Sequence, residues 1–241
     1  MVAFFFPPGV FRTTPRASFV TSDSAENEFF GQSTYTFSST SIGAASVSRL
    51  VVVTVGFCDR IGIGRTISSA TIGGVTATIN TQINDAASTA PGVGIVSAVV
   101  PTGTTGDVVI NFSGLVHGCG IGVFTLYDLI SATPTDTDST ITGVLGGTSG
   151  SISRTSSVLQ NNGVIVSVGL NSTFDTPTIS CTSTVTEVFD LSINNSIDGS
   201  TIRVNGGLAS DLTLGDKTVT HGGTNSSSGG WGLFLSCASW R

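Results

Sequence analysis

The chain has 241 residues and a formal net charge of −6, and only 10% of its residues are charged. This length allows one large β-sandwich or two small ones. The nine basic residues are scattered singly, which argues against nucleic-acid binding because no basic stripe is present to follow a phosphate backbone. The polar surface must come mostly from Ser, Thr, Asn and Gly, and such a surface suits packing against other protein copies.

The first 30 residues differ from the rest of the chain, because they hold half of its fourteen phenylalanines. Prolines at positions 7, 8 and 15 exclude a helix and favour an extended path. We expect residues 1–30 to form an extended arm that packs along its own sandwich or on a neighbouring subunit, and residues 31–241 to form the β-sandwich domain. The candidate assembly contacts are Phe4, Phe5, Phe6, Phe11 and Phe19.

The chain is organised around residues 49–80. A β-branched run from Leu50 to Val55 is apolar on both faces, which predicts a buried central strand. Two further strands, 67–72 and 75–79, flank Gly73-Gly74, a dipeptide that can adopt the positive φ angles of a tight hairpin turn. The sequence therefore predicts a buried strand followed by a β-hairpin.

The remaining predicted elements are also strands, separated by turns rich in Gly, Ser, Thr and Asp. They cover residues 33–39, 93–100, 107–113, 121–130, 163–170, 184–191, 201–204 and 231–236, with a possible short strand around Ile141. No useful window shows helical periodicity. We predict an all-β protein, an antiparallel β-sandwich of jelly-roll type.

A weak internal echo leaves a second architecture open. Residues 50–56 (LVVVTVG) are similar to 164–169 (VIVSVG), and 120–126 (GIGVFTL) are similar to 230–235 (GWGLFL). Both pairs are separated by about 110 residues, close to the size of one immunoglobulin-like unit. Two tandem immunoglobulin-like sandwiches are the alternative. We favour a single sandwich, because no Pro-rich or charged linker separates the halves.

The four cysteines are widely spaced and show no CxxC pair. Free buried thiols that pack as small hydrophobic groups are the favoured interpretation. If the echo reflects two equivalent halves, the natural disulfides are Cys58–Cys119 and Cys181–Cys237. A zinc site would need close-set ligands, so no metal is expected.

Sequence motifs for catalysis are weak throughout. The chain has no GxSxG nucleophile elbow, and His117 and His221 lie in no recognisable triad context. Glu187 and Asp190 are three residues apart on a predicted strand and should point to opposite faces, which does not suit a glycosidase pair. The Gly62–Gly64 loop lacks a P-loop lysine. We therefore expect no enzyme activity and no cofactor.

The sequence also bears on targeting. No run of about 18 apolar residues predicts a transmembrane helix. The apolar N-terminus lacks a basic region and is interrupted early by Pro7 and Pro8, so we expect cytosolic synthesis without a cleaved signal peptide and no membrane contact.

Five segments taken together resemble virion proteins of tailed bacteriophages. They are RLVVVTVGF, ISSATIGGVTATI, VPTGTTGDVVINFS, GVFTLYDLI and TEVFDL, and they fall within about residues 30 to 190. In that family a VVV-rich strand leads to a TIGG hairpin and then to a PTGT segment. The matched positions are packing and turn positions, so the resemblance brings no catalytic residue with it.

The resemblance implies a jelly-roll or lectin-like sandwich that serves as a capsid decoration protein or as part of a neck, tail or fibre. The expected location is the virion, and the expected partners are the major capsid protein or other virion proteins, with further copies of the chain as a homo-oligomer. A host glycan is a possible ligand of a neck, tail or fibre protein, and the candidate aromatic residues for it are Tyr127, Trp231 and Trp240.

Overall fold

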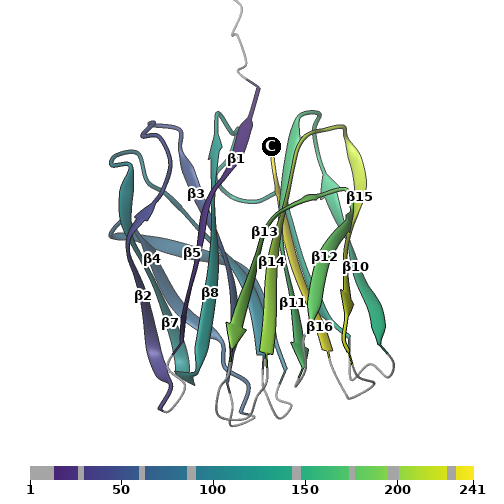
Figure 1. Ribbon diagram of the computed structural model, residues 1–241. Helices are drawn as coiled ribbons and strands as arrows, with labels where there is room; N and C mark the ends of the chain where they lie inside the picture. Colours follow the sequence, from purple (N-terminus) through teal and green to yellow (C-terminus); the bar gives the residue numbers. More distant parts are fainter. Residues whose placement is uncertain are drawn as a thin grey trace, which may run out of the picture.

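The computed structural model describes eight stretches of the chain, namely residues 14–26, 30–59, 63–85, 91–142, 148–173, 177–194, 201–226 and 232–241. These residues form sixteen β-strands and no helix (Figure 1). The first eight are β1 (Arg16–Glu26), β2 (Gln32–Ser41), β3 (Leu50–Cys58), β4 (Ile67–Ile72), β5 (Val75–Asn84), β6 (Pro91–Val99), β7 (Thr105–Val116) and β8 (Gly118–Tyr127). The second eight are β9 (Asp136–Ile141), β10 (Ser149–Val158), β11 (Gly163–Thr173), β12 (Thr178–Ser183), β13 (Thr186–Asn194), β14 (Thr201–Leu212), β15 (Gly215–Thr224) and β16 (Gly232–Trp240).

The strand order occurs twice. The first eight strands form one sheet in the order β1-β8-β3-β6-β5-β4-β7-β2, and the second eight form β9-β16-β11-β14-β13 and β10-β15-β12. If each set is numbered from one to eight, both contain the series 1-8-3-6-5 and 4-7-2, with strands 1, 8, 3 and 6 in one layer, as in a jelly roll. The expected antiparallel, jelly-roll-like fold is therefore confirmed. The preference for a single sandwich is wrong, because the strands form two tandem units, and these have jelly-roll and not immunoglobulin-like strand order.

The internal echo has a structural counterpart. The strands β3 and β11 are the third strand of each unit, while β8 and β16 are the eighth. Both pairs carry the similar sequence segments, and in each unit the third strand lies between the eighth and the sixth. We call β1–β8 the first unit and β9–β16 the second unit.

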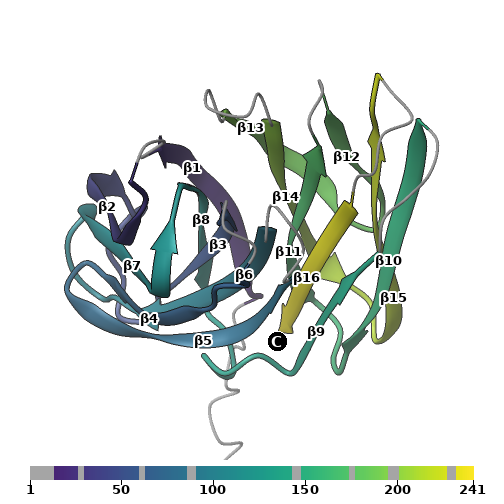
Figure 2. The ribbon, with the colours of Figure 1, turned by 90° about the horizontal axis from the view of Figure 1, so that it is seen from below.

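The hairpin predicted at Gly73-Gly74 is confirmed. These residues connect β4 to β5 with φ angles of 57° and 79°, which are accessible to glycine at little cost. Strand β5 then runs on to Asn84 and pairs with both β4 and β6, so the sheet of the first unit is continuous and rolls up (Figure 2).

Three hydrophobic cores hold the layers together. The first-unit core fills the rolled sheet and includes Tyr35, Val53 and Ile110. The interface core joins the β1-β8-β3-β6 face of the first unit to the five-stranded sheet of the second, and includes Phe124 and Trp240. The second-unit core lies between the sheets β13-β14-β11-β16-β9 and β10-β15-β12.

Glycines at alternate positions of β8 let the two units approach closely. Gly118, Gly120 and Gly122 face the interface core, while the cysteine and apolar residues between them face the first-unit core. A Cβ atom added to Gly122 would lie 2.0 Å from the ring of Phe189 on β13. The absence of side chains here is what makes room for Phe189.

The strand β1 belongs to the folded body although it falls within the predicted arm. Residues 16–26 pair with β8 along their whole length. The structure thus places Phe19 in a strand, and the predicted contacts Phe4, Phe5, Phe6 and Phe11 lie outside the described residues.

Candidate functional site

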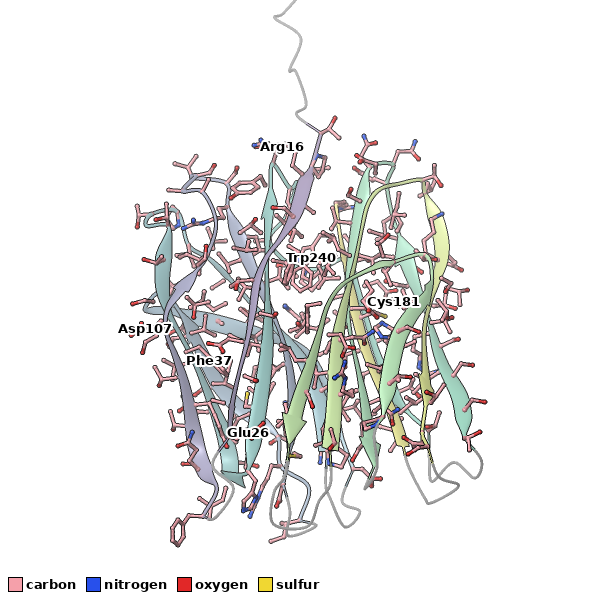
Figure 3. All side chains as sticks on the ribbon, in the orientation of Figure 1. Arg16, Glu26, Phe37, Asp107, Cys181 and Trp240 are labelled. Carbon is pink, nitrogen blue, oxygen red and sulfur yellow. The ribbon has the colours of Figure 1, made fainter. Side chains whose placement is uncertain are left out.

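A polar network crosses the core of the second unit, and it is the most concentrated set of reactive side chains among the described residues. It joins one side chain from each of five strands: Ser167 (β11), Cys181 (β12), Glu187 (β13), Asn205 (β14) and His221 (β15). Ser167, Asn205 and His221 are fully buried, Cys181 is half-buried, and Glu187 lies at the surface (Figure 3 labels Cys181).

The network fits because glycines lie opposite its members. In the register of β11 and β14, Ser167 pairs with Gly207 and Asn205 pairs with Gly169. A Cβ atom on Gly169 would lie 2.2 Å from Nδ1 of His221, and one on Gly207 would lie 2.7 Å from Oγ of Ser167. The imidazole therefore occupies space that a side chain at position 169 would fill.

The hydrogen bonds define the proton positions. The Nδ2 group of Asn205 donates to Oε2 of Glu187 at 2.7 Å, so Oδ1 of Asn205 is the acceptor for Nδ1–H of His221 at 2.8 Å. Nε2 of His221 then carries the lone pair and accepts from Oγ–H of Ser167 at 2.9 Å.

Burial sets the charge states in the network. Desolvation lowers the pKa of His221 to about 3, so the ring is neutral at pH 7. Burial, with the charge of Glu187 as a second cause, raises the pKa of Cys181 to about 12, while the hydrogen bond from Asn205 opposes the shift. The thiol is protonated and lies 3.7 Å from Nε2 of His221.

Ser167, His221 and Asn205 share the bonding order of a nucleophile, a base and an orienting group. Acyl transfer also requires a substrate carbonyl to reach Oγ of Ser167, and this side chain is 0% exposed between two sheets. We interpret the network as a polar anchor that satisfies buried groups and fixes the stacking of the two sheets.

The two strand carboxylates lie on the same side of the sheet, contrary to the sequence prediction. A bulge at Val188 lets Glu187 pair with Gly207 and Phe189 with Gly206, so the alternation is shifted by one residue. Glu187 accepts from Asn205, and Asp190 forms an ion pair with Arg203. Each carboxylate therefore has its own partner within the sheet.

The four cysteines are free, and the pairs Cys58–Cys119 and Cys181–Cys237 are not bridged. Cys58 lies opposite Gly118, so Cys119 is one position further along β8 and points to the other face of the sheet. The two thiols accordingly belong to different cores. Cys181 and Cys237 come from different sheets, and burial raises the pKa of Cys237 to about 12.

The candidate ligand-face aromatics are not gathered on one face. Trp240 is 0% exposed in the interface core and donates from Nε1 to the carbonyl oxygen of Ala132 at 3.1 Å, so no ligand can reach it (Figure 3). Tyr127 donates from its hydroxyl to the carbonyl oxygen of Ala44, and the guanidinium of Arg16 lies 5.3 Å from its ring centroid. Trp231 lies outside the described residues.

Arg49, which immediately precedes β3, has a structural role. It is fully buried and donates three hydrogen bonds of 2.7 Å, to the carbonyl oxygens of Gly43, Val100 and Thr102. These bonds tie two loops of the first unit to the start of β3, and they satisfy the buried guanidinium.

The surface between the units has a groove of about 560 Å³. One wall is the outward face of β5 and β6. The other is formed by residues 132–135, which connect the first unit to β9, and by the first two residues of β9. The sequence did not single out this site, because its walls are distant in the chain.

Within the described residue ranges, no group of three or more His, Cys, Asp or Glu side chains is placed to hold a metal ion. The same part of the chain contains no helix with the length and apolarity needed to cross a membrane.

Comparisons with known proteins give remote likenesses only. No protein-family model matches the chain, and no curated protein matches it. A solved structure of Red Clover Necrotic Mosaic Virus is similar over 98% of this chain and 91% of its own, with 10% identity and a TM-score of 0.24. One of Cucumber Necrosis Virus is similar over 96% of this chain and 91% of its own, with 11% identity and a TM-score of 0.23. At these scores the likeness carries no argument, and the fold assignment rests on the strand order.

Proposed function

We propose that the protein is a non-enzymatic structural component of a tailed-bacteriophage virion, where it acts as a decoration protein on the capsid surface. The five segments that resemble virion proteins support this proposal, since four of them form β3, the β4–β5 hairpin, β7 and β8 of one jelly roll, and the fifth lies in β13. Four of the five segments thus belong to one folded unit.

The observation that carries the proposal is the outward face of the sheet β10-β15-β12. Its side chains are short, and all but one are uncharged: Ser149, Ser151, Ser153, Thr155, Ser157, Asp216, Thr218, Thr220, Gly222, Thr224, Thr178, Ser180 and Thr182. Burying such a face against a partner immobilises few long side chains and desolvates one carboxylate. A surface of this kind suits repeated contacts in a protein lattice.

Hydroxyl groups on this face also bond to one another across the strands. Ser153 lies 2.8 Å from Thr220, and Thr178 lies 2.6 Å from Thr224, both measured between hydroxyl oxygens. Because these side chains are already ordered, contact with a partner costs less conformational entropy.

We assign the anchor to residues 1–13, which precede the body and include Phe4, Phe5, Phe6 and Phe11. Residues 16–26 cannot serve as a detachable arm, since they form β1. Deletion tests of anchoring must therefore end before Arg16, because a deletion of residues 1–30 would expose the edge of β8.

The test is to mix the purified protein with undecorated phage heads and image the particles by electron microscopy. We expect regularly spaced density over the head lattice, and loss of that density for a variant lacking residues 2–13 that melts like the full chain. Density confined to one vertex or to the tail, or no binding, would contradict the decoration role. Sedimentation of the free protein measures the proposed homo-oligomer.

A neck, tail or fibre component is the second candidate. The observation that favours it is the groove between the units, which a surface-coating role does not require. Tail-only density in the same images would support this candidate.

A further inference from the structure

The groove between the two units has the composition of a ligand site. Strand β5 passes the edge strand β9 of the second unit (Figure 2). The groove lies at this crossing, and its volume of about 560 Å³ lies within the usual range of small-molecule sites. Val99, which is 44% exposed, provides apolar surface, while Leu50 and Ile79 line the groove with side chains that pack in or against the protein cores.

Polar groups converge on this apolar surface from both walls. Ser97 is only 4% exposed, and its Oγ accepts from Nδ2 of Asn80 at 2.8 Å. This bond uses neither the hydroxyl hydrogen of Ser97 nor the Oδ1 oxygen of Asn80, so one donor and one acceptor remain for other partners. Thr76 and Thr78 project from the same face of β5. The facing wall adds Thr133 and Thr137, while the hydroxyl group of Thr135 in the same wall donates to the carbonyl oxygen of Ser239 at 3.2 Å.

The charge of the lining selects the class of ligand. No Lys, Arg or His lines the groove among the described residues, and its one carboxylate, Asp136, accepts from the backbone amide of Ser157 at 2.6 Å. Such a lining disfavours anions. It offers paired donors and acceptors beside apolar surface, and a pyranose ring presents the complementary pattern of hydroxyl groups and C–H faces.

We propose that this groove binds neutral oligosaccharides. No aromatic ring lines it among the described residues, so one site should be weak, with a Kd of about 1 mM. Many copies on a particle would raise the avidity well above that of one site. The binding itself does not depend on the virion role, and only the gain in avidity does.

The test uses the full chain with maltotetraose, cellotetraose and chitotetraose as neutral probes and with sialyllactose as an anionic comparison. Saturation-transfer NMR reports contact, and titration of protein amide shifts gives the affinity. We expect transfer to at least one neutral probe and none to sialyllactose. Thr78→Lys should lower the affinity at least about tenfold because the longer chain fills the groove, and Asn80→Ala should lower it less.

The matched control is Thr155→Lys, which places the same exposed substitution on the outward face of β10. It should bind like the unmodified chain, and thermal melts should show all three variants folded. The proposal is overturned if none of the three neutral probes receives transfer at about 10 mM. It is also overturned if Thr78→Lys binds as well as Thr155→Lys, because binding would then lie elsewhere. Either failure leaves the particle-binding test of the proposed function unaffected.

Discussion

The ring of Phe19 on β1 stacks on the ring of Phe189 on β13, with centroids 5.7 Å apart and planes inclined by 22°. The same Phe19 ring also meets Phe124 of β8 edge-on at 5.6 Å. The first strand of the first unit therefore contributes directly to the contact between the units, and it is part of the fold that holds the two jelly rolls together.

Replacing Phe19 tests this role. We expect Phe19→Ala to lower the free energy of unfolding by about 2–4 kcal/mol, because it removes aromatic contacts with both units. Phe30→Ala makes the same change at a side chain that is 81% exposed, and it should alter stability by less than about 0.5 kcal/mol. Urea denaturation measures both free energies of unfolding. Equal losses for the two variants would contradict a role of Phe19 in the contact between the units.

The close approach of Gly122 to Phe189 gives a second prediction. We expect Gly122→Ala to destabilise the protein by about 3 kcal/mol, since its Cβ would lie 2.0 Å from the Phe189 ring. Adding Phe189→Leu should recover part of the loss, because the smaller side chain can move away from the new methyl group. Gly222→Ala, where the nearest heavy atom is 3.4 Å from the added Cβ, is the matched control. Strictly additive losses in the double variant would contradict the proposed contact.

The sequence predicted strands well where a β-branched run or a turn dipeptide marks them. Strand β3 and the β4–β5 hairpin follow from β-branched runs and from Gly73-Gly74, and these features depend on local sequence only. Strands β10, β12 and β15 were not predicted, because Ser and Thr fill most of their positions and few buried apolar residues mark an inward face. Only Ile152 and Val158 on β10, and Val219 on β15, are buried large aliphatic residues of those two strands. A strand of this composition has the same residue usage as a loop.

The polar network could not be predicted for a different reason. Its members come from five strands, and they meet because the register places Gly169 under His221 and Gly207 beside Ser167. Sequence spacing contains no information about such a register. The bulge at Val188, which changes the direction of Glu187, is likewise a property of strand pairing.

The thiols give a third prediction. We expect the native protein to react slowly with a water-soluble thiol reagent, since three cysteines are buried and burial raises the pKa of Cys119, Cys181 and Cys237. After unfolding without reductant, all four should react. Thermal melts with and without reductant should superimpose, and a count of two or fewer thiols after unfolding would show that disulfides are present.

The buried imidazole makes stability depend on pH. The pKa of His221 is about 3 in the folded protein and near 6.5 when the chain is unfolded, so the unfolded state takes up a proton first as the pH falls. The contribution of neutral His221 is fully present above about pH 6.5. It is lost as the pH falls from 6.5 toward 3, by up to about 1.4 kcal/mol per pH unit.

Comparison with His221→Asn isolates this contribution, because the carboxylates of the protein titrate in both chains. The variant should be less stable at pH 7, since Ser167 and Asn205 lose buried hydrogen bonds, but its stability should fall less steeply between pH 6.5 and 4. The two curves of unfolding free energy against pH, measured with urea, should therefore converge on acidification. Parallel curves would mean that His221 takes up its proton at the same pH in the folded and unfolded states, and that the groups packed around it, including Glu187, offset the cost of burying its charge.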